Sequence, residues 1–161
     1  MNADKRRYTV MHADREARRE MGAAMNADEK HPHSRLTEDI VGCAFEDDNT
    51  LGSGHSEKVR EAALVLASME HGHEAVRQVE LPVQYSGKTV GKLFADICVD
   101  NQILVEVKEV RRILPEHSSQ SLRYLKSAKY EVGLLLNFGS RVEIVRRIDT
   151  MKYRRMISTP Q

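Results

Sequence analysis

The spacing of apolar and polar positions changes its period along the chain. Residues 36–46 and 56–72 place apolar side chains three or four positions apart, the period of an amphipathic helix. Between residues 75 and 110 apolar and polar residues alternate, as they do in strands that bury one face. A polar helical stretch then follows Pro115, and two short apolar stretches come after it. The pattern predicts the order helix, helix, three strands, helix and two strands.

Each of the first two helices is expected to bury one face. In the first helix, Thr37 is a suitable N-cap, because its hydroxyl can accept a hydrogen bond from a free backbone N–H group. The apolar stripe of that helix consists of Ile40, Val41, Ala44 and Phe45. A loop with Gly52 and Gly54 should follow. The predicted buried face of the second helix consists of Val59, Ala62, Ala63, Leu66 and Met69.

The strands are expected to form one sheet. Residues 75–85, 89–99 and 102–110 are separated by the short turn sequences "SGK" and "DN", which favour antiparallel hairpins. A helix over residues 116–130 precedes strands at 132–138 and 141–148. No internal repeat is present. This order predicts an α/β (α+β) fold with a mixed central β-sheet flanked by helices.

Composition limits the classes of protein that the chain can represent. A chain of 161 residues normally forms one main domain. Its formal net charge of +1 gives no global basic field, so a nucleic-acid partner would have to meet a local patch. No apolar run approaches the roughly 20 residues of a membrane span, and no secretory signal is present. Cys43 and Cys98 lie outside any CxxC pair, which favours buried free thiols and a cytoplasmic location without a membrane partner.

The two ends of the chain differ from its middle. Residues 1–35 carry many charges without a sustained apolar period, and are interpreted as a polar N-terminal extension that is partly disordered. The folded domain is placed at residues 36–150, and residues 151–161 form a basic C-terminal tail. In that tail Arg154 and Arg155 are candidates to bind a phosphate backbone. The other interpretation of the tail is a plain solvated charge run.

Asp96, Glu106 and Lys108 interrupt the strand-forming parts of the stretch "FADICVDNQILVEVK". Side-chain alternation puts Glu106 and Lys108 on one face of their strand, and the preceding hairpin can bring Asp96 beside Glu106. Two converging carboxylates are ligands that Mg²⁺ accepts, and a nearby lysine can activate a water molecule or stabilise charge on a phosphate. The other interpretation is that an E-x-K sequence simply marks a half-exposed strand.

The helix that follows adds a polar face to this arrangement. His117, Gln120 and Tyr124 are spaced so that they share one side of the helix over residues 116–130. Directly after the E-x-K strand, such a face can line a polar cleft. A solvated helix face is the competing interpretation.

Together these motifs resemble the PD-(D/E)XK nuclease superfamily. Asp96, the sequence Glu106-Val107-Lys108 and the spacing of Gln120 and Tyr124 match its D…ExK and QxxxY motifs. From about residue 36 to 148 the chain looks more closely like the small GxxExxY proteins of that superfamily. The stretches that carry this likeness are "LTEDIVGCAF", "GKLFADICVDNQILVEVKEV", "LPEHSSQSLRYLK" and "VGLLLNFGS".

The resemblance implies a restriction-endonuclease-like core and a metal-dependent nuclease that hydrolyses phosphodiester bonds of DNA or RNA. It implies that Asp96 and Glu106 bind Mg²⁺ or Mn²⁺, with the Val107 carbonyl as a further ligand. Lys108 would orient the attacking water, and Glu57 would assist as catalytic residue and metal ligand. The resemblance implies that Gln120 and Tyr124 steady the lysine or contact a substrate phosphate. His117, from the same helix face, and Arg154 and Arg155, from the basic tail, are further candidates for substrate binding.

One position departs from the motif that names the GxxExxY proteins. Gly54 and Glu57 are present, but Arg60 stands where the tyrosine should be. A second hypothesis therefore stays open, a catalytically silent nuclease fold that binds nucleic acid or a protein partner. A third is a structural domain that needs no metal. DNA or RNA as substrate, endo- or exonucleolytic cleavage, and a homo-oligomer or a protein partner stay open as well.

Overall fold

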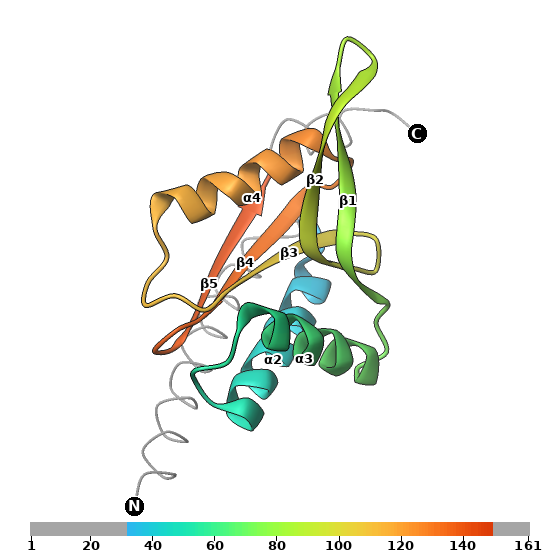
Figure 1. Cartoon of the computed structure of the whole chain (residues 1–161). Helices are drawn as coiled ribbons and strands as arrows, with labels where there is room; N and C mark the ends of the chain where they lie inside the picture. Colours follow the sequence, from blue (N-terminus) through green and yellow to red (C-terminus); the bar gives the residue numbers. More distant parts are fainter. Residues whose placement is uncertain (1–31, 150–161) are drawn as a thin grey trace, which may run out of the picture. The chain divides into compact units, whose positions relative to one another are not determined.

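The computed structural model of the chain describes residues 32–149 (Figure 1). From Arg35 onward the described residues belong to one compact unit. The domain boundaries predicted at residues 35 and 150 stay predictions, and most of the N-terminal extension and the whole basic tail lie outside the described residues. The elements are α2 (Ser34–Leu51), α3 (Glu57–Glu70), β1 (Ala75–Tyr85), β2 (Lys88–Val99), β3 (Ile103–Lys108), α4 (Pro115–Ser127), β4 (Val132–Phe138) and β5 (Val142–Ile148).

Within residues 32–149 the strands form one five-stranded sheet in the order β1-β2-β3-β4-β5. Neighbouring strands are antiparallel except β3 and β4, which are parallel. A parallel pair needs a long crossover connection, and α4 supplies it. The predicted α/β (α+β) fold with a mixed sheet and flanking helices is confirmed. Within the same residues, no helix combines the length and apolar character needed to cross a bilayer.

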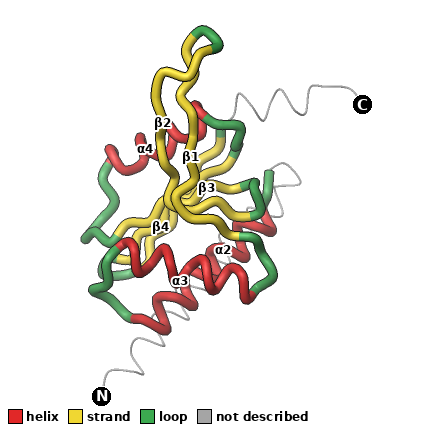
Figure 2. The backbone as a smooth tube through the Cα atoms, turned by 45° about the vertical axis from the view of Figure 1, so that its right-hand side comes forward, coloured by secondary structure: helices red, strands yellow, loops and turns green. Residues whose placement is uncertain are grey.

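The sheet is covered by helices on both faces, with α4 on one side of the strands and α2 and α3 on the other (Figure 2). Under α2 and α3 the core contains Ile40, Leu64, Ile97, Val105, Leu134 and Phe138. On the α4 side a second cluster contains Leu81, Ala95, Cys98, Leu104, Tyr124 and Leu125. Both cysteines are free and buried, as expected. Since β3 is buried on both faces, a charged side chain on it must find its partners inside the protein.

Helix α2 differs from its prediction at both ends. It begins at Ser34, so Thr37 is a buried residue inside the helix and not its cap. It also continues to Leu51 through the polar segment that was predicted to be a loop. The reason is that Asp47 points inward, where it forms an ion pair with Arg60. The helix ends where Gly52 takes a φ of 72° that favours glycine, and the N–H of Gly52 donates to the Asp48 carbonyl.

The predicted buried face of α3 is wrong. Val59, Leu66 and Met69 are exposed by 41%, 62% and 57%. The face turned to the sheet carries Arg60, Glu61, Leu64, Ala67 and Ser68. Burial of these polar groups is tolerated because each has a partner: Arg60 binds Asp47, Glu61 binds Arg77, and the Ser68 hydroxyl donates to the Leu64 carbonyl.

Strands β1 and β2 form a hairpin that extends past the rest of the sheet (Figures 1 and 2). β2 pairs with β3 only over residues 97–99, whereas it pairs with β1 along almost its whole length. In β1 the regular strand geometry breaks at Gln78, which has a φ of 51°. Because the ladder between β2 and β3 is so short, the sheet splits between these two strands. The predicted site residues Asp96, Glu106 and Lys108 lie at that split.

Candidate active site

The ladder between β2 and β3 ends at the pair of Ile97 and Val105, and Asp96 is the β2 residue just outside it. Past that pair, no strand of the described part of the chain pairs with β3 on this side. The carboxylate of Asp96 takes this place, since its Oδ2 accepts a hydrogen bond of 2.8 Å from the Val107 N–H. Burial raises the pKa of Asp96, and the Val107 hydrogen bond opposes that rise. The side chain is therefore fixed beside β3, next to Glu106.

Glu106 lies on β3, with 3% of the residue exposed. Its Oε1 lies 3.1 Å from Lys108 Nζ and accepts a hydrogen bond of 2.8 Å from Gln120 Nε2. Its Oε2 is buried and has no hydrogen-bond partner among residues 32–149. Burial, together with the negative charge of Asp96, raises the pKa of Glu106 to about 7. A buried carboxylate oxygen without a partner is costly and leaves room for a cation or a proton.

Lys108 lies between two carboxylates. Its Nζ is 3.1 Å from Glu106 Oε1 and 3.8 Å from Glu57 Oε2, at the N-terminal end of α3. Burial disfavours the charged ammonium, but Glu106 and Glu57 outweigh this effect, so the pKa of Lys108 is raised above its ordinary value. At neutral pH the side chain is a cation that can donate hydrogen bonds, and it is not a base.

Helix α4 contributes the other wall. Gln120 Nε2 donates to Glu106 Oε1 and to the hydroxyl of Tyr124, the second bond at 2.7 Å. Burial raises the pKa of Tyr124, so its hydroxyl stays protonated. His117 has a different local role, since its Nδ1 accepts from the Leu114 N–H at the start of the helix. The structure thus brings Gln120 and Tyr124 to Glu106, and it uses His117 to cap α4.

Sequence reasoning missed Glu61. This residue lies one turn after Glu57 on α3, is almost fully buried, and accepts hydrogen bonds from Arg77 at 3.0 Å and from Gln78 at 3.1 Å. Its charge is one of the causes that raise the pKa of Asp96, after burial. The spacing of four residues from Glu57 is the sequence signal that could have found it, because such residues share a helix face.

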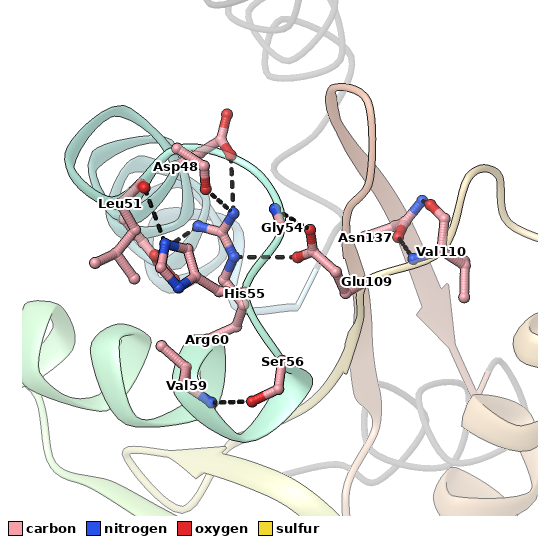
Figure 3. Close-up of polar contacts among 12 residues, drawn as sticks. Asp48, Leu51, Gly54, His55, Ser56, Val59, Arg60, Glu109, Val110 and Asn137 are labelled. Atoms are coloured by element: carbon pink, nitrogen blue, oxygen red, sulfur yellow. Dashed lines mark hydrogen bonds and ion pairs between the residues drawn. The ribbon is translucent and has the colours of Figure 1, made fainter.

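Arg60, which replaces the motif tyrosine, is completely buried. Its guanidinium bonds to Asp47 Oδ1 at 2.9 Å, to Asp48 Oδ1 at 3.4 Å and to Glu109 Oε2 at 3.1 Å. It also donates to the Gly52 carbonyl and lies over the Phe138 ring. Burial raises the pKa of Asp47 and of Asp48, against the attraction of Arg60. Arg60 therefore joins the end of α2, the α2–α3 loop and the residue after Lys108 (Figure 3).

The segment after β3 is held from two sides (Figure 3). Glu109, already bound by Arg60, accepts a second hydrogen bond of 3.1 Å from the Gly54 N–H. Asn137 of β4 then bonds to both the N–H and the carbonyl of Val110, at 2.9 Å and 2.8 Å. A Cβ at Gly139 would come within 2.0 Å of the Val110 carbonyl oxygen, so the chain needs glycine there. These contacts fix the backbone next to Lys108.

The site offers a cation oxygen ligands, but it is not a closed cage. Between residues 32 and 149, no three His, Cys, Asp or Glu side chains gather in a way that could hold a metal ion by themselves. Two carboxylates fit a divalent cation, and the unpartnered Oε2 of Glu106 is the observation that supports this fit. Arg154 and Arg155, predicted to bind phosphates, lie outside the described residues.

The fold and these side chains define an α+β protein with a carboxylate and lysine site where two strands separate. A sequence profile of the PD-(D/E)XK nuclease superfamily matches residues 34–148, so the chain belongs to that superfamily. The crystal structure of SSO0001 is similar, with a TM-score of 0.46 and 19% identity, covering 78% of this chain. This chain spans 65% of the length of that one. No curated protein matches the chain.

Proposed function

We propose that the protein is a metal-dependent nuclease that hydrolyses phosphodiester bonds in DNA or RNA at the split between β2 and β3. Membership of a nuclease superfamily makes nucleic acid the expected substrate. The observation that supports catalysis most directly is Glu106, whose one carboxylate oxygen binds Lys108 and Gln120 while the other has no partner.

Asp96 and Glu106 are the proposed ligands of Mg²⁺ or Mn²⁺, with the Val107 carbonyl and Glu57 as further ligands. When bound, such an ion supplies positive charge that stabilises the phosphate in the transition state. Hydrolysis forms a bond from a water oxygen to phosphorus and breaks the bond from phosphorus to the leaving oxygen. The water loses a proton, and the leaving oxygen gains one.

The protonated Lys108 positions the water and stabilises negative charge that develops on the phosphate. It does so as a hydrogen-bond donor, because its raised pKa keeps it charged. Gln120 holds Glu106 in orientation from α4, and the Tyr124 hydroxyl is within reach of the same amide. Substrate contacts by Gln120, Tyr124, His117, Arg154 and Arg155 belong to the same proposal.

The assignment to the GxxExxY proteins is also a proposal. It is supported by Gly54 and Glu57 at the expected spacing, and by the position of Gly54, whose N–H bonds to Glu109 next to Lys108. Arg60 does not relax this region. It provides four polar contacts and an aromatic contact where the motif has a tyrosine.

The test is cleavage of single- and double-stranded DNA and RNA by the purified full chain, with Mg²⁺, with Mn²⁺ and with EDTA. Cleavage is expected with either metal and not with EDTA. Lys108→Ala should lower the rate by about 10²-fold or more, the scale for losing one such group, while leaving metal binding intact. Lys126→Ala, which removes an exposed lysine of α4, is the matched control and should cut like wild type.

If the wild-type protein cuts none of these substrates with either metal, the nuclease proposal is wrong for the isolated chain. The catalytically silent binding module then takes its place. On that hypothesis wild type, Asp96→Asn and Lys108→Ala bind nucleic acid alike, and the metal makes no difference.

A further inference from the structure

The hairpin of β1 and β2 has one face packed on the protein and one face free. Leu81 and Ala95 belong to the cluster that contains Tyr124 and Leu125 of α4. The opposite face exposes apolar side chains: Phe94 is exposed by 49% and Val90 by 63%. This free face, formed by Val90, Lys92 and Phe94, is called here the outer hairpin face.

The outer hairpin face ends near the candidate active site. Val90, Lys92 and Phe94 alternate along β2 toward Asp96, and the regular alternation of faces breaks between Ala95 and Ile97, which belong to different core clusters. At a rise of about 3.3 Å per residue, Phe94 stands roughly 7 Å along the strand from Asp96. A polymer that is cut beside Asp96 must pass close to this face.

The charges of the hairpin suit an anionic polymer. Toward its tip the hairpin carries Lys88 and Lys92, and on the same face Glu80 stands directly across from Phe94 and pairs with Lys92. Lys92 Nζ lies 2.9 Å from Glu80 Oε1, but both side chains of this pair are about half exposed. Exposed pairs contribute little to stability, so Lys92 can turn to a phosphate at small cost.

Phe94 is the feature that distinguishes kinds of nucleic acid. Every base has an aromatic face that can stack on a phenyl ring, but in a duplex these faces already stack on each other. An exposed ring beside the cutting residues therefore favours a strand whose bases are free. Phosphates attract lysines in both kinds of nucleic acid, so the lysines alone would not discriminate.

We propose that the outer hairpin face binds an unpaired nucleic-acid strand next to the scissile bond, with a base stacked on Phe94 and phosphates at Lys88 and Lys92. This rests on the proposed function for its substrate class. It adds a preference for single-stranded over double-stranded substrate, and it assigns that preference to Phe94.

The test measures binding of the full chain to a fluorescein-labelled single-stranded oligonucleotide of mixed sequence and to its duplex, by fluorescence anisotropy. The measurements use wild-type protein in EDTA and Asp96→Asn protein with Mg²⁺, so that nothing is cut. Phe94→Ala should weaken single-strand binding by about 5- to 100-fold and duplex binding much less. Phe94→Tyr should retain the affinity, because tyrosine also stacks.

Two further variants complete the design. Lys88→Ala should lower the slope of log affinity against log salt by about 0.7 for the single strand. Leu66→Ala removes an apolar side chain on α3 that is exposed by 62%, and should leave binding unchanged. Leu66 thus controls for the general effect of losing an exposed apolar group.

The proposal is overturned if wild type shows no single-strand binding, if Phe94→Ala binds like wild type, or if it loses single-strand and duplex affinity equally. It is also overturned if sedimentation shows that wild type self-associates and Phe94→Ala does not, since the face would then bind protein. Cleavage is scored separately. If the protein cuts nothing but its single-strand binding depends on Phe94, the proposed binding surface is supported and the nuclease proposal is wrong. If Phe94→Ala changes neither cleavage nor binding, only the proposed binding surface is wrong.

Discussion

Glu106 is a residue that the protein keeps at a cost. Its carboxylate is buried on β3, and only Oε1 has partners. An ionised buried oxygen without a hydrogen bond destabilises the folded state, and a proton relieves this cost. The raised pKa of Glu106 is the measure of that cost. A cation bound beside Glu106 would relieve the same cost.

The first prediction concerns pH. In the unfolded chain Glu106 titrates near 4.5, and in the folded protein its pKa is about 7. A raised carboxylate pKa means that the folded state holds the proton more tightly, so the free energy of unfolding falls as pH rises from about 4.5 to about 7. The loss is on the order of 3 kcal/mol at most, from this difference in pKa.

Glu106→Gln removes this titration while keeping the shape of the side chain. In EDTA the variant should lose less stability than wild type over the same pH range, measured by Tm or by urea unfolding. Its Tm above neutral pH should equal or exceed that of wild type. Equal pH slopes for the two proteins would show that Glu106 does not carry this penalty.

At the scale of elements, Arg60 joins parts that are distant in sequence. It connects α2, the α2–α3 loop and Glu109, the residue after Lys108, in one network. Removing one member of a buried ion pair costs about 3–5 kcal/mol, because the remaining charge stays buried. We therefore expect Arg60 and its acidic partners to be energetically coupled, so that the cost of replacing one depends on whether the other is present.

Restoring the motif tyrosine tests that expectation. Arg60→Tyr alone should destabilise the protein by about 3 kcal/mol or more, since it leaves Asp47 buried without its cation. Adding Asp47→Asn to Arg60→Tyr should recover part of that loss, giving a non-additive cycle in urea unfolding. Additive effects of the two substitutions would mean that the pair is not coupled.

Gly139→Ala tests the contact between the β4–β5 turn and the segment after β3, and Gly42→Ala in α2 is its comparison. Gly139→Ala places a methyl group against the Val110 carbonyl and should destabilise the protein by about 2 kcal/mol or more. Gly42 lies in α2 with nothing within 4 Å of an added Cβ, so Gly42→Ala should stabilise it by about 0.5–1 kcal/mol. Urea unfolding of both variants measures the contrast. A neutral Gly139→Ala would show that this contact yields easily.

The order of elements could be predicted from the sequence, because it depends on local periods and turns. The predicted strands 75–85 and 132–138 agree with β1 and β4. The buried face of α3 could not be predicted, since Arg60 and Glu61 are buried only by virtue of partners on α2 and β1. The same long-range pairing kept Asp47 inside a helix where its sequence favours a loop.

The residues of the candidate site also fall into those that the sequence predicts and those that it does not. Asp96, Glu106 and Lys108 were accessible to reasoning because a hairpin and strand alternation bring them together. The burial of Glu61 and the hydrogen bonds that Arg60 and Gly54 donate to Glu109 depend on the packing of α3 against the sheet, which no short motif encodes. Family resemblance supplied Glu57, whose Oε2 lies 3.8 Å from Lys108 Nζ, and its role stays a prediction.

For the whole molecule, a cation that binds only the folded state should stabilise it. Wild-type Tm is therefore expected to rise with Mg²⁺ or Mn²⁺ above its value in EDTA. Asp96→Asn should abolish the rise while leaving a cooperative transition. Glu46→Gln, at an exposed carboxylate of α2, should keep it. A full response to metal in Asp96→Asn would place the ion elsewhere.

The kinked strand β1 has a consequence for how the protein behaves at high concentration. β1 lies at the edge of the sheet, and an unpaired edge is a template on which identical chains can stack into aggregates. The φ of 51° at Gln78 interrupts the regular row of backbone groups, and Pro82 has no N–H to donate. The edge is therefore a poor seed for fibrils. The hairpin of β1 and β2 can therefore expose apolar side chains such as Phe94 and Val90, while its edge strand β1 resists edge-to-edge polymerisation.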